Sequence, residues 1–258
     1  MNPIILARDV SFAYNDQPAL RAVTMDASPG EIVAILGPNG SGKSTLLLAL
    51  LGHLAVTGEI SFDGRAIGQW RRRDLARVLA YLPQTPRHEA GQTVWDILRL
   101  GRAPYWGAFG LESSQDEQIA RDVARQLELD DLLKRRIDEM SGGQRQRVFI
   151  GRCLTQEPRA LLLDEPTTFL DLKHQIELLK LLRDLAKSKN IAIVLASHEL
   201  NLAGAFADRL VLLDQGAVAA SGRPHEVLVP AILEKVYGMP VQRLEIPGGA
   251  PVVVPRLS

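Results

Sequence analysis

A glycine-rich stretch from Gly37 to Thr45, GPNGSGKST, places a lysine and hydroxyl side chains directly after closely spaced glycines. The apolar run EIVAIL before it indicates a buried strand, and LLLALL after it indicates a packed helix. Glycines at such a turn let the backbone close around an anion, and the free N–H groups and positive dipole of a helix N-terminus attract one. The stretch is therefore predicted to bind a phosphate group.

The spacing of this stretch matches the phosphate-binding P-loop, with Gly37, four residues, and then Gly42, Lys43 and Ser44. In that pattern the lysine reaches the β- and γ-phosphates and the hydroxyl holds Mg²⁺. A flexible surface turn with an isolated lysine is the alternative, and the flanking strand and helix disfavour it. We expect a nucleoside triphosphate to bind these residues: Gly37, Pro38, Asn39, Gly40, Ser41, Gly42, Lys43, Ser44 and Thr45.

Two acidic residues, Asp164 and Glu165, end the apolar strand ALLL. Adjacent strand residues point to opposite faces, so Asp164 is expected to serve Mg²⁺ while Glu165 polarises the water that attacks the γ-phosphate. An exposed acidic strand end before Pro166 is the alternative. His198 also ends a strand and could donate a hydrogen bond to a γ-phosphate oxygen, although a histidine in isolation is more often only solvent-facing. The remaining histidines show no metal-ligand spacing: His53, His88, His174 and His225.

The elements around these residues predict a parallel sheet. RALLLDEP and IAIVLASHE are continuous apolar strands separated by the amphipathic helix LKHQIELLKLLRDLAKSKN. Ligands of such sheets bind beyond the carboxyl ends of the strands. The P-loop, Asp164-Glu165 and Ser197-His198 are therefore expected at one rim.

The other parts of the chain have different patterns. Residues 4 to about 65 alternate short β-like runs with turns, including a hairpin at Asp63-Gly64, and indicate an antiparallel sheet. Residues from about 91 to 155 form a helical insertion, in which Ser114 and Glu117 are expected to make a capping box. The tail contains a predicted hairpin around Gln215-Gly216 and a helix entered at Pro230.

Composition excludes several classes of protein. The 258 residues are 46% hydrophobic, which allows a substantial core, and Lys plus Arg balance Asp plus Glu at 30 each, so no basic field suggests nucleic acid. One cysteine, Cys153, cannot form an internal disulfide and is expected to be a buried, inert thiol. The run LLLALLG is far short of the ~20 residues of a membrane helix. We expect a cytosolic protein that spans no membrane.

A second glycine-rich segment, MSGGQRQR from Met140 to Arg147, opens another helical run with Ser141 and two glycines. Its free N–H groups could also receive an anion. An ordinary serine cap on a surface helix is the alternative. A helical insertion separates this segment from the P-loop, so one domain cannot easily wrap both around one γ-phosphate. A second copy of the chain could supply it.

These motifs, in this order, resemble the nucleotide-binding subunits of ATP-binding-cassette transporters over nearly the whole chain. The P-loop and the strand ending LLLDEP carry the resemblance, together with MSGGQ, where Met140 replaces the Leu of the family signature LSGGQ. Gln84 after AYLP resembles the Q-loop glutamine, and TFLD with Asp171 resembles the D-loop. His198 in SHELN resembles the switch histidine, and Tyr14 in SFAYNDQPAL resembles the aromatic that stacks on adenine. A core role for Tyr14 is the alternative. Phe169 departs from the small residue common in the D-loop, and Glu199 from the usual Asp.

The resemblance implies an α/β fold in which residues 1–258 form one ABC-type P-loop ATPase domain, with an N-terminal antiparallel β subdomain and a helical signature subdomain inserted at about 91–155. It implies ATP and Mg²⁺ as ligands, and a head-to-tail homodimer that clamps ATP between one P-loop and the other chain's signature. The implied roles are catalytic for Glu165, His198 and Gln84, metal-binding for Ser44, Gln84 and Asp164, and trans contacts for Ser141, Gly142, Gly143, Gln144 and Asp171.

PTTFLDLKHQIELL, TVWDILRLGRAPY and VYGMPV most resemble the branch that energises uptake of iron–siderophore complexes, with haem or cobalamin import as alternatives. This branch implies a peripheral protein at the cytoplasmic face of the inner membrane, bound to a permease dimer and only indirectly to an extracytoplasmic substrate-binding protein. Cassette ATPases that act on DNA or ribosomes fit poorly, because the chain lacks a long coiled-coil insertion, a second cassette and a basic stripe. A P-loop kinase would leave MSGGQ and Glu165 unexplained.

Overall fold

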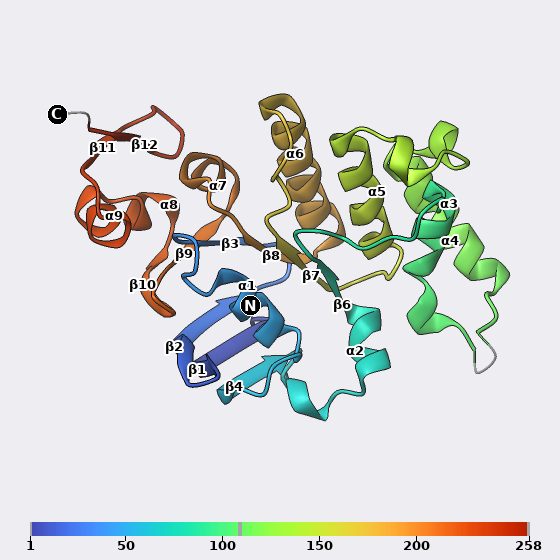
Figure 1. Ribbon diagram of the computed structural model, residues 1–258, viewed down its shortest axis with the longest axis horizontal. Coiled ribbons are helices and arrows are strands. Elements are labelled where there is room, and N and C mark those ends of the chain that lie inside the picture. The colour runs from blue at the N-terminus through green and yellow to red at the C-terminus, as the bar shows by residue number, and fades with distance from the viewer. Residues whose placement is uncertain (1, 108–109, 257–258) are drawn as a thin grey trace.

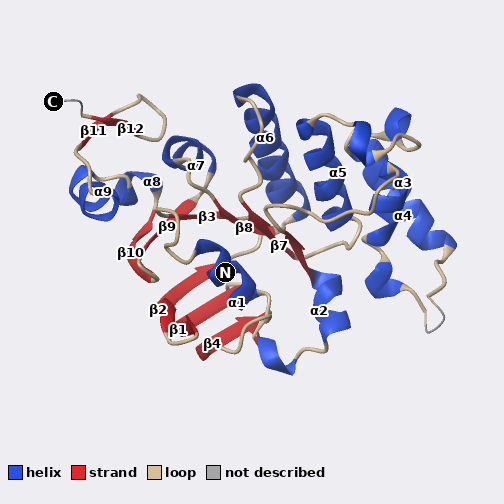
Figure 2. Ribbon diagram, viewed as in Figure 1, coloured by secondary structure: helices blue, strands red, loops and turns tan. Residues whose placement is uncertain are grey.

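The computed structural model describes residues 2–107 and 110–256, which are arranged around two sheets (Figures 1 and 2). The predicted domain of residues 1–258 also includes residues 1, 108–109 and 257–258, which lie outside the described residues. The larger sheet has the order β10-β9-β3-β8-β7-β6, with only β10 antiparallel to its neighbour. Its strands are β3 (Ile32–Leu36), β6 (Leu79–Leu82), β7 (Ala160–Asp164), β8 (Ala192–Ala196), β9 (Arg209–Asp214) and β10 (Ala217–Gly222). The predicted parallel sheet is confirmed.

The smaller sheet is antiparallel, with the order β2-β1-β4-β5. Its strands are β1 (Ile5–Tyr14), β2 (Gln17–Ala27), β4 (Thr57–Phe62) and β5 (Arg65–Ala66). The turn between β4 and β5 is Asp63-Gly64, and β9 and β10 are joined at Gln215-Gly216, so both predicted hairpins are confirmed. A short two-stranded sheet pairs β11 (Val241–Leu244) with β12 (Val252–Pro255).

Strand β3 explains why the central strands are apolar throughout. Val33 and Ile35 pack into a core shared with the antiparallel sheet and helix α1 (Lys43–Leu50), whereas Ile32, Ala34 and Leu36 pack into a core under the helices of the opposite face. Alternate side chains of a strand enter opposite faces, and both faces of this sheet are covered. No position in β3 is left for a polar side chain.

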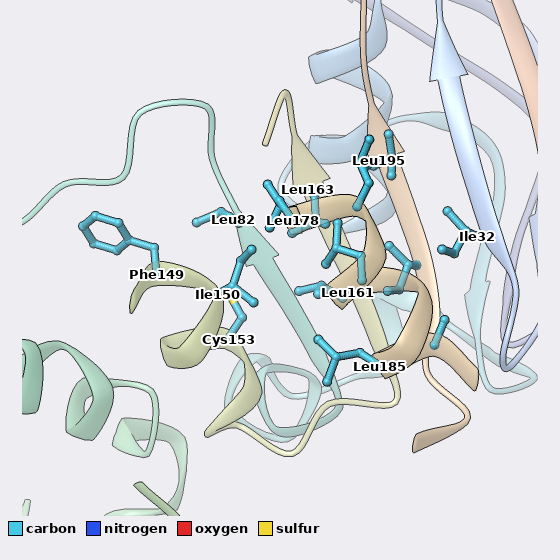
Figure 3. Packing of buried hydrophobic residues seen from close by; sticks show 14 of the residues in the cluster. Ile32, Leu82, Phe149, Ile150, Cys153, Leu161, Leu163, Leu178, Leu185 and Leu195 are labelled. Carbon is cyan, nitrogen blue, oxygen red and sulfur yellow. The ribbon is translucent and has the colours of Figure 1, made fainter. Parts of the chain in front are cut away.

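Helices α5 (Gly142–Leu154), α6 (Leu172–Lys189) and α7 (Leu200–Phe206) cover the opposite face of the large sheet. Helices α3 (Val94–Leu100) and α4 (Ser114–Gln126) pack against α5 beside the sheet (Figure 1). Figure 3 shows Ile150 and Cys153 of α5 and Leu178 and Leu185 of α6 among the leucines of β6 and β7. The remaining helices are α2 (Arg72–Val78), α8 (Pro224–Val227), α9 (Pro230–Tyr237) and the short 3-10 turns Ile67–Gln69, Ala103–Tyr105, Asp130–Leu132 and Ile137–Glu139. In the described ranges, no helix has both the length and the apolar character that a membrane crossing requires.

The predicted capping box of α4 is wrong by one residue. The N-cap is Ser113, whose hydroxyl accepts the N–H of Asp116, and the Asp116 carboxylate accepts the N–H of Ser113 at 3.0 Å. Asp116 Oδ1 also accepts a hydrogen bond from Nε of the buried Arg102 at 2.9 Å. This contact fixes the residue at which the helix starts. Ser114 and Glu117 are instead the first and fourth residues of the helix.

Cys153 is buried in the core between α5 and the large sheet, as predicted. Burial raises the pKa of its thiol to about 12. A thiol with this pKa remains protonated at neutral pH, so Cys153 is a poor nucleophile.

Candidate nucleotide site

The strand order brings the predicted site residues to one rim of the large sheet. β3, β8, β7 and β6 are consecutive parallel strands, and their carboxyl ends are followed by the P-loop, Ser197-His198, Asp164-Glu165 and Gln84 respectively. The prediction that the first three groups converge at one rim is confirmed. Gln84, which the sequence assigned only by resemblance, lies at the same rim.

Glycines of the P-loop are required by close backbone contacts. Gly37 has φ 147° and Gly42 has φ 102°. A Cβ atom on Gly37 would lie 2.3 Å from the carbonyl oxygen of Leu213, and one on Gly42 would lie 2.6 Å from that of Ala19. Only glycine fits both positions, and helix α1 begins directly afterwards at Lys43.

Lys43 is held inside the curve of the P-loop. Its Nζ donates hydrogen bonds to the carbonyl oxygens of Gly37 at 2.9 Å and Pro38 at 3.1 Å. Burial lowers the pKa of this ammonium, and the nearby carboxylates of Glu165 and Asp164 oppose that shift. The site therefore holds a partly desolvated cation at the N-terminus of α1, an arrangement that suits a polyphosphate.

Ser44 and Asp164 supply hard oxygen donors next to this lysine. The Ser44 hydroxyl donates to Asp164 Oδ1 at 3.0 Å, and Asp164 is buried at the end of β7. Burial raises the pKa of Asp164, the Ser44 hydrogen bond and the Lys43 charge lower it, and the Glu165 charge raises it further, with a net upward shift. A hydroxyl beside a carboxylate suits Mg²⁺, which usually takes only one or two protein oxygens together with substrate phosphates. The described ranges contain no group of three or more His, Cys, Asp or Glu side chains that could hold a metal ion.

Glu165 lies outside the strand, in a left-handed conformation with φ 47°. Strand alternation is therefore not what separates it from Asp164, because the backbone turns directly after β7. Its Oε2 atom accepts hydrogen bonds from Gln84 Nε2 at 3.1 Å and Thr168 Oγ1 at 3.1 Å, and lies 3.2 Å from His198 Nδ1. This carboxylate is the centre of the polar groups at the rim.

A single cavity joins these groups. It is lined by Tyr14, Ala19, Gly37, Pro38, Asn39, Gly40, Gly42, Lys43, Ser44, Thr45, Gln84, Glu165, His198 and Tyr237. Tyr14 is 47% exposed and packs edge-to-face on Phe12, so its position does not favour the alternative core role. Sequence reasoning missed Ala19, Tyr237 and Thr168. Only Thr168 had a local signal, a hydroxyl three residues after Glu165.

The signature segment lies elsewhere on the chain. Ser141 caps α5 and forms a capping box with Gln144, and none of residues 140–144 lines the cavity. In the D-loop, Asp171 caps α6, and Phe169 is 88% exposed with φ 67°. One chain therefore does not bring its own signature to its own P-loop.

Comparison with known proteins agrees with the family that the motifs resemble. The family model described as "ABC transporter" matches residues 20–168. The Bacillus subtilis protein YusV, named "Probable siderophore transport system ATP-binding protein", is 37% identical over 98% of this chain and 92% of its own. The hemin import ATP-binding protein HmuV of Rhodococcus jostii is 39% identical over 97% and 85%, and the achromobactin transport ATP-binding protein CbrD of Dickeya dadantii is 39% identical over 91% and 88%.

Solved structures share the fold. A chain from an inward-facing metal-chelate type ABC transporter superimposes with a TM-score of 0.87 at 31% identity, covering 99% of this chain and 98% of that one. The dimeric structure of MJ0796, a bacterial ABC transporter cassette, superimposes with a TM-score of 0.74 at 27% identity, covering 85% and 98%.

Proposed function

The chain belongs to the ABC transporter family as an ATP-hydrolysing subunit of importer type, and from this premise we propose that it energises the import of iron–siderophore complexes. The observation that carries the proposal is the near-full-length similarity to YusV and CbrD, which are named for siderophore and achromobactin transport. Haem import is the second candidate, since HmuV relatives match at 39–40% identity.

In the proposed binding mode, the P-loop residues 37–45 hold the phosphates of ATP and Tyr14 stacks on adenine. Lys43 supplies a point charge to the β- and γ-phosphates. The P-loop glycines support this mode, because Gly37 and Gly42 take positive φ angles and admit no side chain directly before the N-terminus of α1. Ser44 and Asp164, with Gln84, would hold Mg²⁺, which when bound neutralises phosphate charge.

For hydrolysis, we assign Glu165 to accept the proton of the attacking water. His198 and Gln84 are assigned to orient the reacting groups, and their distances of 3.2 and 3.1 Å from the Glu165 carboxylate support this. Thr168, which donates to the same oxygen, would hold the carboxylate in place.

The ATP site is proposed to be completed by a second copy of the chain. Ser141 to Gln144 and Asp171 are placed on the partner's nucleotide, because this segment does not reach the cavity of its own chain. Each chain would form one domain, with residues 91–155 as the inserted helical subdomain. Two such chains would form the working homodimer. It would bind a permease dimer peripherally, at the cytoplasmic face of the inner membrane, and meet the extracytoplasmic binding protein only through that permease.

The cargo and the partners are tested by purifying the tagged protein from its native membrane and identifying the subunits that co-purify. A permease encoded with a siderophore-binding protein supports the proposal. ATP-dependent ⁵⁵Fe–siderophore uptake should then depend on the chain, whereas uptake of haem alone would replace the first candidate with the second.

The proposed hydrolytic roles predict that Glu165→Gln retains ATP–Mg²⁺ binding but loses turnover by at least about 100-fold, the lower range for a positioned general base. The amide keeps the shape of the side chain but is a poor proton acceptor. Binding is measured by equilibrium titration and turnover by phosphate release. Hydrolysis close to that of the unchanged protein would assign the base elsewhere.

A further inference from the structure

His174 connects two segments that the sequence treats as separate motifs. It lies in the first turn of α6, and its Nδ1 atom is 2.7 Å from Asp171 Oδ1. The same carboxylate oxygen accepts the backbone N–H of His174 at 2.9 Å. These two contacts hold the ring against the D-loop carboxylate.

The ring of His174 also packs against the signature. A Cβ atom built on Gly143 would lie 2.8 Å from Cδ2 and 3.1 Å from Cγ of His174, and its three nearest atoms all belong to that side chain. Gly143 does not have a positive φ, so backbone conformation does not require glycine there. The requirement comes from the imidazole ring, which fills the space of a side chain at position 143.

The neighbouring backbone segments are in contact as well. A Cβ atom on Gly142 would lie 3.6 Å from the carbonyl oxygen of Phe169 and 3.8 Å from Leu170 Cδ2. The start of α5 and residues 169–171 are therefore packed together, and His174 lies against both Gly143 and Asp171. Gly143, Leu170, His174 and Leu178 also line part of one hollow.

We propose that His174 is a positioning residue that sets the spacing between the signature helix end, Ser141 to Gln144, and the D-loop carboxylate of Asp171. This inference rests on the proposed function, in which both segments act together on the partner chain's nucleotide. His174 touches neither the chain's own P-loop nor its cavity. Its removal therefore changes turnover in the dimer and leaves the chain's own ATP affinity unchanged.

Three substitutions separate the two contacts. His174→Ala removes both, His174→Asn keeps a donor near the position of Nδ1, and His174→Phe keeps a ring against Gly143. Lys173→Ala is the matched control, because Lys173 lies on the same turn with an 80% exposed side chain, whose ammonium is 3.9 Å from the Glu177 carboxylate. The measurements are kcat from phosphate release at saturating ATP–Mg²⁺, the Kd of trinitrophenyl-ATP for the dilute monomer, and the melting temperature.

The expected result is a kcat for His174→Ala lower by about 10- to 100-fold, the effect of displacing positioned groups by up to about 1 Å. The Kd for the nucleotide should stay that of the unchanged protein. His174→Asn and His174→Phe should each recover part of the lost kcat, and Lys173→Ala should keep all of it. In a Glu165→Gln background, His174→Ala should also weaken the ATP-dependent dimer seen by size-exclusion chromatography.

A kcat for His174→Ala equal to that of Lys173→Ala would overturn the inference. So would a loss of kcat with a parallel loss of nucleotide affinity and melting temperature in all three His174 variants, since that pattern indicates general damage to the fold. Ser141→Arg separates failure of the inference from failure of the proposed function. If Ser141→Arg is fully active, the shared site itself is wrong; if it is inactive while His174→Ala is active, only the role of His174 is wrong.

Discussion

At the residue scale, the buried carboxylate of Asp164 lowers the stability of the folded chain. Its carboxylate is buried at the end of β7, where desolvation raises its pKa despite the hydrogen bond from Ser44 and the charge of Lys43. A side chain chosen for stability alone would carry no charge there. The cost is consistent with the proposed role of Asp164 at a metal ion, since functional sites are where such local conflicts are found.

Asp164→Asn is therefore predicted to raise the melting temperature of the nucleotide-free protein and to abolish Mg²⁺-dependent ATP hydrolysis. The amide keeps an oxygen that can accept the Ser44 hydrogen bond but carries no buried charge. Because the folded pKa of Asp164 is raised above 3.8, the folded state binds more protons than the unfolded state between these two values. The free energy of unfolding of the unchanged protein thus falls as pH rises through that window, whereas Asp164→Asn does not titrate.

The advantage in melting temperature of Asp164→Asn should accordingly widen as pH rises from 3.8 through the folded pKa, and stay constant above it. Differential scanning fluorimetry across this range measures it. Asp74→Asn is the control, with a half-exposed carboxylate that should give no increase. A lower melting temperature for Asp164→Asn at neutral pH would show that the charge stabilises the fold.

Residue types predicted which side chains lie at the rim, because the glycine, lysine and carboxylate patterns directly follow apolar strands in the sequence. The conformation of Glu165 could not be predicted in this way. Strand alternation was the only local rule available, yet the residue takes a left-handed φ and its carboxylate is held by Gln84, Thr168 and His198. Two of these three partners are distant in the sequence, so the geometry depends on the strand order.

At the scale of elements, the misplaced capping box of α4 also reflects the difference between a local sequence pattern and a contact with a distant residue. Ser113 with Asp116 and Ser114 with Glu117 are equivalent local patterns, each a serine with an acidic residue three positions later. Arg102 decides between them, because its buried guanidinium donates to Asp116 Oδ1. The strands and helices were predicted from apolar patterning and the hairpins from turn residues, whereas the register of this capping box depends on a contact that forms only in the folded chain.

Arg102 joins helices α3, α4 and α5. Arg102 follows α3, and its Nε donates to Asp116 in the first turn of α4. Its Nη1 donates to two residues that follow α5, the carbonyl oxygen of Thr155 at 2.7 Å and the carboxylate of Glu157 at 2.8 Å. Its guanidinium stacks on the ring of Tyr105, 3.7 Å from the centroid. The side chains of Arg102 and Asp116 are only 4% and 6% exposed.

We predict that Arg102→Ala lowers the free energy of unfolding by about 3–5 kcal/mol, because it leaves the buried Asp116 charge without its partner. Arg125→Ala, which breaks an exposed pair with Asp122 on α4, should cost only about 0.3–0.5 kcal/mol. Thermal melting of both variants beside the unchanged protein gives the comparison. Equal melting temperatures for the two variants would mean that the Arg102 network does not hold α3, α4 and α5 together.

At the scale of the whole molecule, the chain carries two glycine-rich helix starts that lie in different places. The P-loop lines the cavity with Glu165 and His198, while Ser141 to Gln144 lie outside it on the start of α5. A two-fold pair of chains is the simplest closed arrangement that brings each signature to the other chain's P-loop, and it yields two equivalent ATP sites. In the proposed arrangement, ATP hydrolysis would be a property of the pair.

The last prediction follows from that arrangement: specific ATPase activity of the isolated protein rises with protein concentration until the dimer is populated. Ser141→Arg should lose activity yet bind ATP normally, because it places a bulky side chain at the proposed interface and leaves its own P-loop intact. The double variant Ser141→Arg with Glu165→Gln should fail to form the ATP-dependent dimer that Glu165→Gln alone accumulates. A dilution series with phosphate release, alongside light scattering with and without ATP–Mg²⁺, tests each point. Specific activity that stays constant down to concentrations where only monomer scatters, with Ser141→Arg fully active, would contradict the shared site and leave Ser141 as an ordinary helix cap.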